Sequence, residues 1–149
     1  MPEGIEESGT VATINFLDAV TLTDDYDDNT SDAFAVSPFT QLEFIFDYTE
    51  DSGESGNSAL VKLLFSENGT EYHDYSVGSD QTPSGGEVKT ILYPRIFQIQ
   101  GDPGNKVTRW CGVPTSAKYV KVAVMEDGLS SDGGILTVKA RVSNDLTWR

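Results

Sequence analysis

The sequence predicts an all-β domain, an antiparallel two-sheet sandwich of the jelly-roll type with about eight or nine strands. Apolar and polar residues alternate from about residue 10 to the end of the chain, which is the period of strands with one buried face. Clusters of Gly, Pro, Asn and Asp separate these stretches at short intervals, as turns separate strands. No stretch has the apolar spacing of an amphipathic helix.

Nine segments carry the strand pattern. They lie at residues 10–22, 33–37, 41–49, 59–66, 71–77, 87–100, 107–112, 118–126 and 134–143. In the third segment Leu42, Phe44 and Phe46 share one face, and Glu43 and Asp47 share the other. The apolar face is therefore expected in the core.

The turns and the last two segments refine this expectation. Asn68-Gly69 is typical of a two-residue hairpin turn of type I′, in which both central residues need positive φ. Pro94 lies within a strand pattern, so that strand should bend or lie at a sheet edge. Near the C-terminus two segments form a pair with matching apolar faces. One face consists of Val120, Val122 and Val124, and the other of Leu136, Val138, Ala140 and Val142.

The segment 59–66 is apolar on both faces. Val61, Leu63 and Phe65 form its more apolar face, opposite Lys62 and Ser66. The second face also carries two leucines, Leu60 and Leu64. We therefore expect another strand or another subunit to cover this second face in part.

The 149 residues fit a single sandwich domain at 10–149, preceded by an acidic arm at 1–9 that cannot pack on its own. The chain shows no secretory signal pattern and no run of about 20 apolar residues. We therefore expect synthesis in the cytoplasm and no membrane contact.

Negative charge is concentrated in the first part of the chain. Residues 1–61 contain 14 of the 24 acidic residues and no Lys or Arg, whereas the other 10 acidic residues are balanced by 10 basic ones. Such a field attracts basic surfaces and opposes binding to nucleic acid. We expect attachment to a partner through the arm, the first acidic loop and the outward leucines, that is Glu3, Glu6, Glu7, Asp24, Asp25, Asp27, Asp28, Leu60 and Leu64.

No catalytic residue is predicted. His73 is the single histidine and Cys111 the single cysteine, and neither stands in a nucleophile-and-base pattern. Alternation around Cys111 favours a buried structural cysteine. The acidic residues are so numerous that no carboxylate pair is distinctive. We therefore expect a protein that is not an enzyme and needs no cofactor.

One loop is a candidate for calcium. The spacing Asp25-x-Asp27-x-Asn29 supplies oxygen ligands, but Thr30 and Val36 stand where an EF-hand has Gly and Glu. The loop is thus either a different kind of calcium loop or a solvated acidic turn, and the second alternative is favoured.

Aromatic residues offer a further alternative, because exposed rings can stack on sugars. The candidates are Tyr72, Tyr75, Tyr93, Trp110 and Trp148. Their alternation with apolar neighbours favours packing in the core or in a subunit interface over glycan binding.

A longer pattern suggests a family. The segment 41–49, which ends in Asp-Tyr-Thr, an acidic loop, the apolar segment 59–66 and the turn with its aromatic at 67–72 resemble structural proteins of tailed bacteriophages. The segments 117–124 and 134–140 are similar to the closing hairpin of those proteins. The resemblance extends over residues 40–143 and brings no active site with it.

This resemblance implies a jelly-roll protein located in the virion. The expected role is that of a capsid decoration, or cement, protein that docks on the phage head, with a collar, tail or fibre component as an alternative. The implied partner is the major capsid protein or another virion protein. We also expect a symmetric homo-oligomer, with a trimer favoured, because such an arrangement would close exposed sheet edges and cover Leu60 and Leu64. A carbohydrate-binding β-sandwich module is the alternative from another class.

Overall fold

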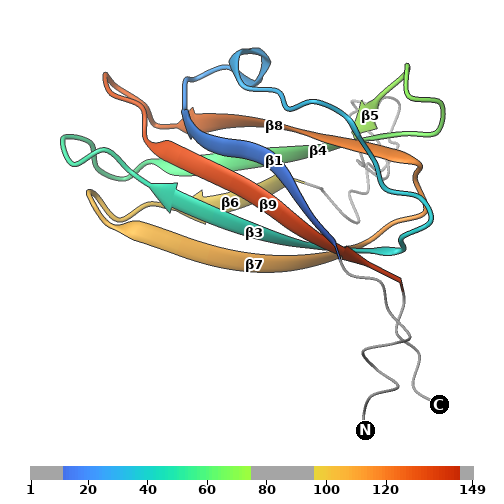
Figure 1. The fold of residues 1–149 in the computed structure, drawn as a ribbon. Helices are drawn as coiled ribbons and strands as arrows, with labels where there is room; N and C mark the ends of the chain where they lie inside the picture. Colours follow the sequence, from blue (N-terminus) through green and yellow to red (C-terminus); the bar gives the residue numbers. More distant parts are fainter. Residues whose placement is uncertain (1–11, 75–95, 145–149) are drawn as a thin grey trace, which may run out of the picture.

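A computed structural model describes residues 12–74 and 96–144 of the chain. Nine strands and one short 3-10 helix form its secondary structure (Figure 1): β1 (Ala12–Thr21), η1 (Tyr26–Asp28), β2 (Phe34–Ala35), β3 (Gln41–Thr49), β4 (Ser58–Ser66), β5 (His73–Asp74), β6 (Ile96–Gln100), β7 (Lys106–Pro114), β8 (Tyr119–Asp127) and β9 (Ile135–Ser143). Within the described ranges, no helix has the length and apolarity needed to cross a membrane.

The strands form two antiparallel sheets. The first sheet has the order β1-β9-β3-β7, and the second has the order β2-β8-β4 with β5 and β6 both paired to β4. β5 pairs with the end of β4 and β6 with its beginning. The first and last strands are neighbours, and the chain crosses repeatedly from sheet to sheet (Figure 1). This is the jelly-roll order, so the predicted fold class is confirmed.

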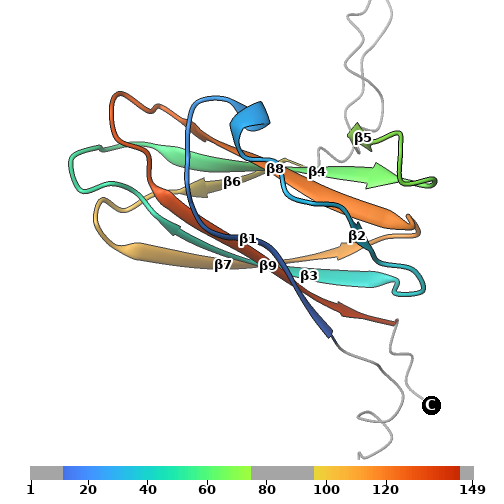
Figure 2. The same cartoon turned by 45° about the horizontal axis from the view of Figure 1, so that its top comes forward.

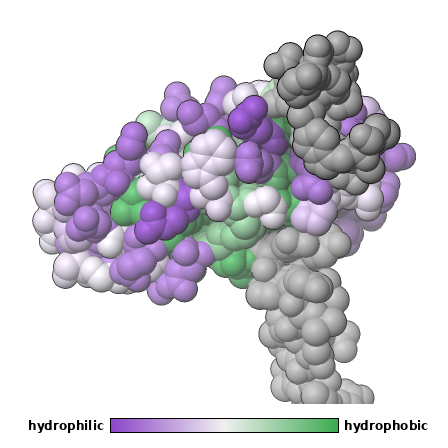
Figure 3. All heavy atoms as spheres, turned by 90° about the horizontal axis from the view of Figure 1, so that it is seen from below, coloured by the Kyte–Doolittle hydropathy of each residue, from purple (hydrophilic) through white to green (hydrophobic). Residues whose placement is uncertain are grey.

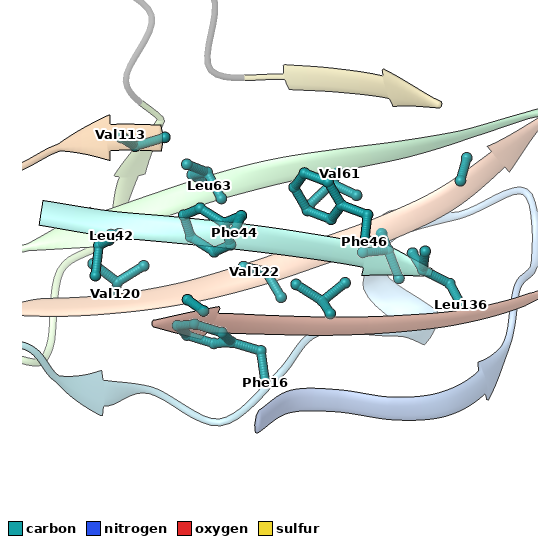
Figure 4. Close-up of a cluster of buried hydrophobic side chains, with 14 of the residues drawn as sticks. Phe16, Leu42, Phe44, Phe46, Val61, Leu63, Val113, Val120, Val122 and Leu136 are labelled. Atoms are coloured by element: carbon teal, nitrogen blue, oxygen red, sulfur yellow. The ribbon is translucent and has the colours of Figure 1, made fainter. Parts of the chain in front are cut away.

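The core lies between the inward faces of the two sheets. Phe44 and Phe46 of β3 stack with ring centroids 5.8 Å apart, and both rings are buried. They pack among inward valines and leucines of β4 and β8, such as Val61 and Val122 (Figure 4). Alternate residues of each strand thus supply one continuous apolar layer.

Most predicted strands are found close to the expected positions. The segment 41–49 coincides with β3, and 134–143 differs from β9 by one residue. The segment 71–77 contains only the two residues of β5 in its described part. Pro94 and the first part of the segment 87–100 lie outside the described residues.

The Asn68-Gly69 turn differs from the prediction. Gly69 has φ +78, but Asn68 is not among the residues with positive φ, so the turn is not of type I′. Instead, the Asn68 side chain accepts the N–H groups of Thr70 and Glu71, and the Ser66 hydroxyl accepts that of Gly69. Side-chain acceptors therefore stabilise a wider connection between β4 and β5.

The last two strands also differ from the predicted hairpin. β8 pairs with β2 and β4 in one sheet, whereas β9 pairs with β1 and β3 in the other. The inward valines of β8 and β9 do face each other, but across the core between the two sheets. A hairpin and a crossing between sheets require the same alternation, so periodicity alone does not distinguish them.

Neighbouring residues of β3 test this arrangement. We expect Phe44→Ala to lower the free energy of unfolding by about 3–5 kcal/mol, because it leaves a cavity in the core. Ile45→Ala, one residue further on the outer face, should lower it by about 1 kcal/mol or less. Urea unfolding of the two variants measures both values, and equal losses would contradict the inward assignment of Phe44.

Candidate functional site

The first acidic loop is built around η1. The Asp25 carboxylate caps this helix by accepting the N–H of Asp27 at 2.9 Å. The Thr23 hydroxyl donates to Asp28 Oδ2 at 2.7 Å, and the Asn29 amide donates to the Thr21 carbonyl at 3.0 Å. These local bonds shape the loop and leave its four carboxylates, those of Asp24, Asp25, Asp27 and Asp28, exposed.

The calcium candidate in this loop remains a prediction. Asp25 acts as a helix cap, and Asn29 turns its N–H₂ group to the backbone of β1. In the described part of the chain, no group of three or more His, Cys, Asp or Glu side chains is arranged to hold a metal ion.

The same loop lies along β8 at the edge of the second sheet. The N–H of Ser31 donates to the Val122 carbonyl at 2.8 Å, and that of Val124 donates to the Asn29 carbonyl at 3.0 Å. Figure 2 shows η1 and β2 on this side of the molecule. The Tyr26 ring then reaches β4, where the ammonium group of Lys62 lies 4.5 Å from its centroid.

This contact brings the loop to the outward leucines. Leu60 and Leu64 lie on either side of Lys62 in β4, on the outer face of the second sheet, and both are half-buried. The partial cover predicted for this face thus includes Tyr26 of the chain's own loop, which lies over Lys62. We call the carboxylates of residues 24–28 together with Leu60 and Leu64 the acidic face. Glu3, Glu6 and Glu7, the other predicted attachment residues, lie outside the described residues.

The acidic stretch 47–54 is not the exposed segment that its sequence suggests. Glu50 is fully buried and Glu54 is 6% exposed. Asp47 accepts a hydrogen bond from the Thr108 hydroxyl across the β3–β7 pair. Glu50 and Glu54 therefore do not contribute to an attachment surface in the way that Asp24 or Asp27 does, and Asp47 is half-buried.

Three glutamates meet at one end of the sandwich. We call Glu50, Glu54 and Glu126, with Tyr48 and Asn57, the buried acidic cluster. Asn57 joins the three carboxylates: its N–H donates to Glu50 Oε2 at 2.8 Å, and its side-chain amide donates to Glu54 Oε1 at 2.9 Å and Glu126 Oε2 at 2.6 Å. The connections β3–β4, β6–β7 and β8–β9 all come together at this end (Figure 1).

The serines of the β8–β9 connection surround Glu54. Its carboxylate accepts the N–H and hydroxyl of Ser130 at 2.8 and 2.7 Å, and also the N–H and hydroxyl of Ser131. These hydrogen bonds, those from Ser130 first, lower the pKa of Glu54 from 4.5 to about 2. Glu54 is therefore held ionised and hydrogen-bonded on both oxygens.

Glu50 and Tyr48 are less well satisfied. Glu50 Oε1 and the Tyr48 hydroxyl are buried without a hydrogen-bond partner among the described residues. The Glu126 carboxylate is near enough to act electrostatically on this hydroxyl. Burial, and then the negative charges of Glu126 and Glu50, raise the pKa of Tyr48, so the phenol stays protonated.

The backbone packs tightly on this cluster. A methyl group on Gly134 would lie 2.6 Å from the Thr49 carbonyl oxygen and 2.9 Å from Glu126 Oε1. A glycine is therefore required there, and its own N–H donates to Glu126 Oε1 at 2.7 Å.

Sequence reasoning missed this cluster, although one signal was present. Glu126 continues the inward series Val120, Val122 and Val124, so the alternation itself places a carboxylate inside the sandwich. Glu50 likewise follows Tyr48 by two residues.

Trp110 is exposed and therefore not packed in the core, while packing in a subunit interface, the other expectation, stays a prediction. It lies on the outer face of β7, opposite Ile45 of β3, and 56% of its surface is exposed. Gly112, two residues further on the same face, leaves open space beside it. Cys111 points the other way and is half-buried rather than buried. Tyr72 is half-buried as well, and Tyr75, Tyr93 and Trp148 lie outside the described residues.

Apolar side chains also reach the surface along the edge of the sandwich. Figure 3 views the molecule from the side on which β7 lies lowest in Figure 1, and it shows apolar side chains in the middle of this face next to a hydrophilic end. β7 pairs with β3 only, among the described strands, so this nine-residue strand is a sheet edge.

His73, the single histidine, is exposed in β5. It lines an open pocket together with Glu67, Glu71 and Asn68.

Comparison with known proteins identifies a shared fold. No protein-family model matches the chain, and no curated protein matches it in sequence. Among solved structures, a chain of the T13 particle of infectious bursal disease virus is similar over 92% of this chain, with 10% identity and a TM-score of 0.51. This chain spans only 31% of that one.

Two further structures are less similar. A disulfide-linked pilus of Bacillus endospore appendages matches 92% of this chain and 91% of its own at 11% identity, with a TM-score of 0.38. Latent PorU from Porphyromonas gingivalis matches 95% of this chain and 13% of its own at 12% identity, with a TM-score of 0.45. At such identities the likeness concerns the fold alone.

The hydrogen bonds of Glu54 predict a dependence of stability on acid. The pKa of Glu54 is about 2 in the folded chain, whereas the ordinary value is 4.5. The ionised carboxylate therefore contributes fully to the free energy of unfolding above pH 4.5, and this contribution is lost as the pH falls towards 2. The difference in unfolding free energy between the wild type and Glu54→Gln should therefore shrink over this window in urea titrations. Ser130→Ala, which removes the hydroxyl donor, should shift the loss to higher pH. A difference that is constant across the window would contradict this assignment.

Proposed function

We propose that this protein is a non-enzymatic structural protein of a virion, a capsid decoration protein that docks on the head and stabilises it. The observation that carries the proposal is the acidic face. There, four exposed carboxylates lie in a loop whose Tyr26 ring contacts Lys62, the residue midway between two half-buried leucines of β4.

The composition of this face fits a docking surface. Interfaces commonly combine an apolar centre with a charged rim, and the rim charges steer the encounter and set the orientation. The acidic face offers Leu60 and Leu64 as the centre and the loop with η1 as the rim. Its partner would be a basic surface with an apolar contact, provided by the major capsid protein or by another virion protein.

The fold and the sheet edges are consistent with assembly. A chain of a virus particle has the same fold, and the sequence resembles structural proteins of tailed bacteriophages. Among the described strands, the nine residues of β7 are paired on one side only, and an exposed edge is commonly covered by association. A symmetric oligomer, with a trimer favoured, would cover such edges.

Rebinding to stripped virions tests the proposal. A variant with Asp24, Asp25, Asp27 and Asp28 all changed to Asn should rebind at least about fourfold more weakly at low salt, since each rim charge contributes about 0.2–1 kcal/mol. Wild-type binding should weaken as salt rises.

A matched variant serves as the control. It loses the same number of charges from the charge-balanced part of the chain through Asp102→Asn, Asp127→Asn, Asp132→Asn and Glu67→Gln, and it should rebind like the wild type. Equal rebinding of both variants, or binding that is indifferent to salt, would contradict attachment through the acidic face. Binding to tails or collars but not to heads would favour the other virion components.

A second candidate function rests on Trp110. Its ring is exposed on the outer face of the first sheet, where Gly112 leaves open space and Thr108 is a polar neighbour along the strand. Such a platform is suited to stacking on a sugar ring. The protein would then be a carbohydrate-binding β-sandwich module.

Affinity electrophoresis in soluble polysaccharides separates the two candidates. If glycan binding is the function, the wild type is retarded, Trp110→Ala loses retardation, and Trp110→Phe keeps part of it because an aromatic face remains. If the docking proposal holds, Trp110→Ala migrates like the wild type and rebinds virions normally.

A further inference from the structure

We infer that the buried acidic cluster is a calcium site, with Glu50 and Glu126 as ligands and Glu54 as a positioning residue. This site is distinct from the acidic face and from the loop with Asp25, Asp27 and Asn29. It would add a requirement for a cation to the folding of the domain, whichever function the domain has.

The first argument is the balance of charge. Glu50 and Glu126 are fully buried and Glu54 nearly so. All the donors that the described residues provide to these carboxylates are uncharged, namely backbone N–H groups, the Asn57 amide and two serine hydroxyls. Buried charges are normally paired or coordinate a metal ion. Three carboxylates joined through one neutral asparagine lack such compensation.

The second argument is an acceptor without a donor. Glu50 Oε1 is buried and has no hydrogen-bond donor among the residues that the structure describes. Leaving such atoms unsatisfied is costly, and each one in a folded protein requires an explanation. A cation bound to Glu50 Oε1 would satisfy the free oxygen and supply the missing charge.

The ligand chemistry selects calcium. The cluster contains carboxylate, hydroxyl and carbonyl oxygens. It includes neither His73, the single histidine, nor Cys111, the single cysteine. Hard cations take oxygen ligands of this kind. The three carboxylates are not already arranged around a common point, because no group of three such side chains in the described ranges is placed to hold a metal ion. The coordination would therefore be completed by carbonyl oxygens and water, which suits the six to eight flexible ligands of Ca²⁺ better than the strict octahedron of Mg²⁺.

The three glutamates differ in their roles. Glu54 accepts five hydrogen bonds, from Asn57, Ser130 and Ser131, which occupy both of its oxygens fully. Each oxygen of Glu126 accepts only one bond and keeps a second lone pair, and Glu50 Oε1 accepts none from the described residues. The part of Glu54 is to fix Asn57, which in turn orients Glu50 and Glu126. The Thr49 carbonyl and Glu126 Oε1 lie on one side of Gly134, which adds a backbone oxygen close to the carboxylates.

Calorimetry with calcium chloride and chelator-stripped protein tests the site. We expect saturable binding, and a rise in melting temperature of about 5–10 °C when calcium is about a hundred times the Kd. Glu50→Gln and Glu126→Gln should each weaken binding by at least about tenfold. The double variant Asp25→Asn with Asp27→Asn is the control and should bind like the wild type.

The sign of the stability change gives a further check. In chelator, Glu50→Gln should melt at a higher temperature than the wild type, because it removes an uncompensated buried charge. In calcium, the order should reverse. A mere loss of packing would lower the melting temperature in both conditions.

Terbium luminescence locates the ion with variants in which Glu50, Glu54 and Glu126 are all unchanged. Tb³⁺ replaces Ca²⁺ and emits when a nearby tyrosine is excited. Tyr48→Phe should lose most of the sensitised emission and Tyr26→Phe should keep it, since Tyr26 lies in the acidic loop. Dependence on Tyr26 would overturn the inference. So would the absence of calcium binding in calorimetry, or a wild type that is stabilised by acid and not by calcium, because protons would then compensate the charge.

Discussion

Burial of the alternate side chains of β3 against β4 and β8 is the constraint on which the rest of the structure depends. Because every second residue of β3 is apolar and inward, the intervening residues must face solvent. This one register places Trp110, opposite Ile45, on the outer face of the first sheet. The matching register of β4 places Leu60 and Leu64 on the outer face of the second sheet. Both candidate binding surfaces are therefore consequences of the core.

The same alternation reaches its limit at one end of the sandwich. Tyr48 ends the inward series of β3, Glu50 continues it beyond the strand, and Glu126 ends the inward series of β8. The core thus ends in carboxylates rather than in apolar side chains. Asn57 and the serines of the β8–β9 connection satisfy most of their oxygens. Closing a sandwich in this way links the β3–β4 and β8–β9 connections through carboxylate hydrogen bonds, which an apolar end would not do.

The acidic side chains of the first 61 residues therefore lie in two separate places in the structure. Asp24, Asp25, Asp27 and Asp28 remain exposed around η1 and lie near the outward face of β4, where they can meet a partner. Glu50 and Glu54 turn inward and belong to the end of the core. Charge counts along a chain do not distinguish these cases, because a carboxylate in a loop is either solvated or held by donors from other loops. An account of attachment has to consider the two groups separately.

The sequence by itself determined the fold class and most of the strands, because period-two alternation directly reports which side of a strand is buried. It also identified Asp25, Asp27, Leu60 and Leu64 as surface candidates. Only the tertiary structure decided that β8 and β9 face each other across the core, that Trp110 points outward, and that Glu50, Glu54 and Glu126 meet at Asn57. Each of these depends on contacts between residues far apart in the chain. Local periodicity is the same whether a strand pairs with its successor or crosses to the other sheet.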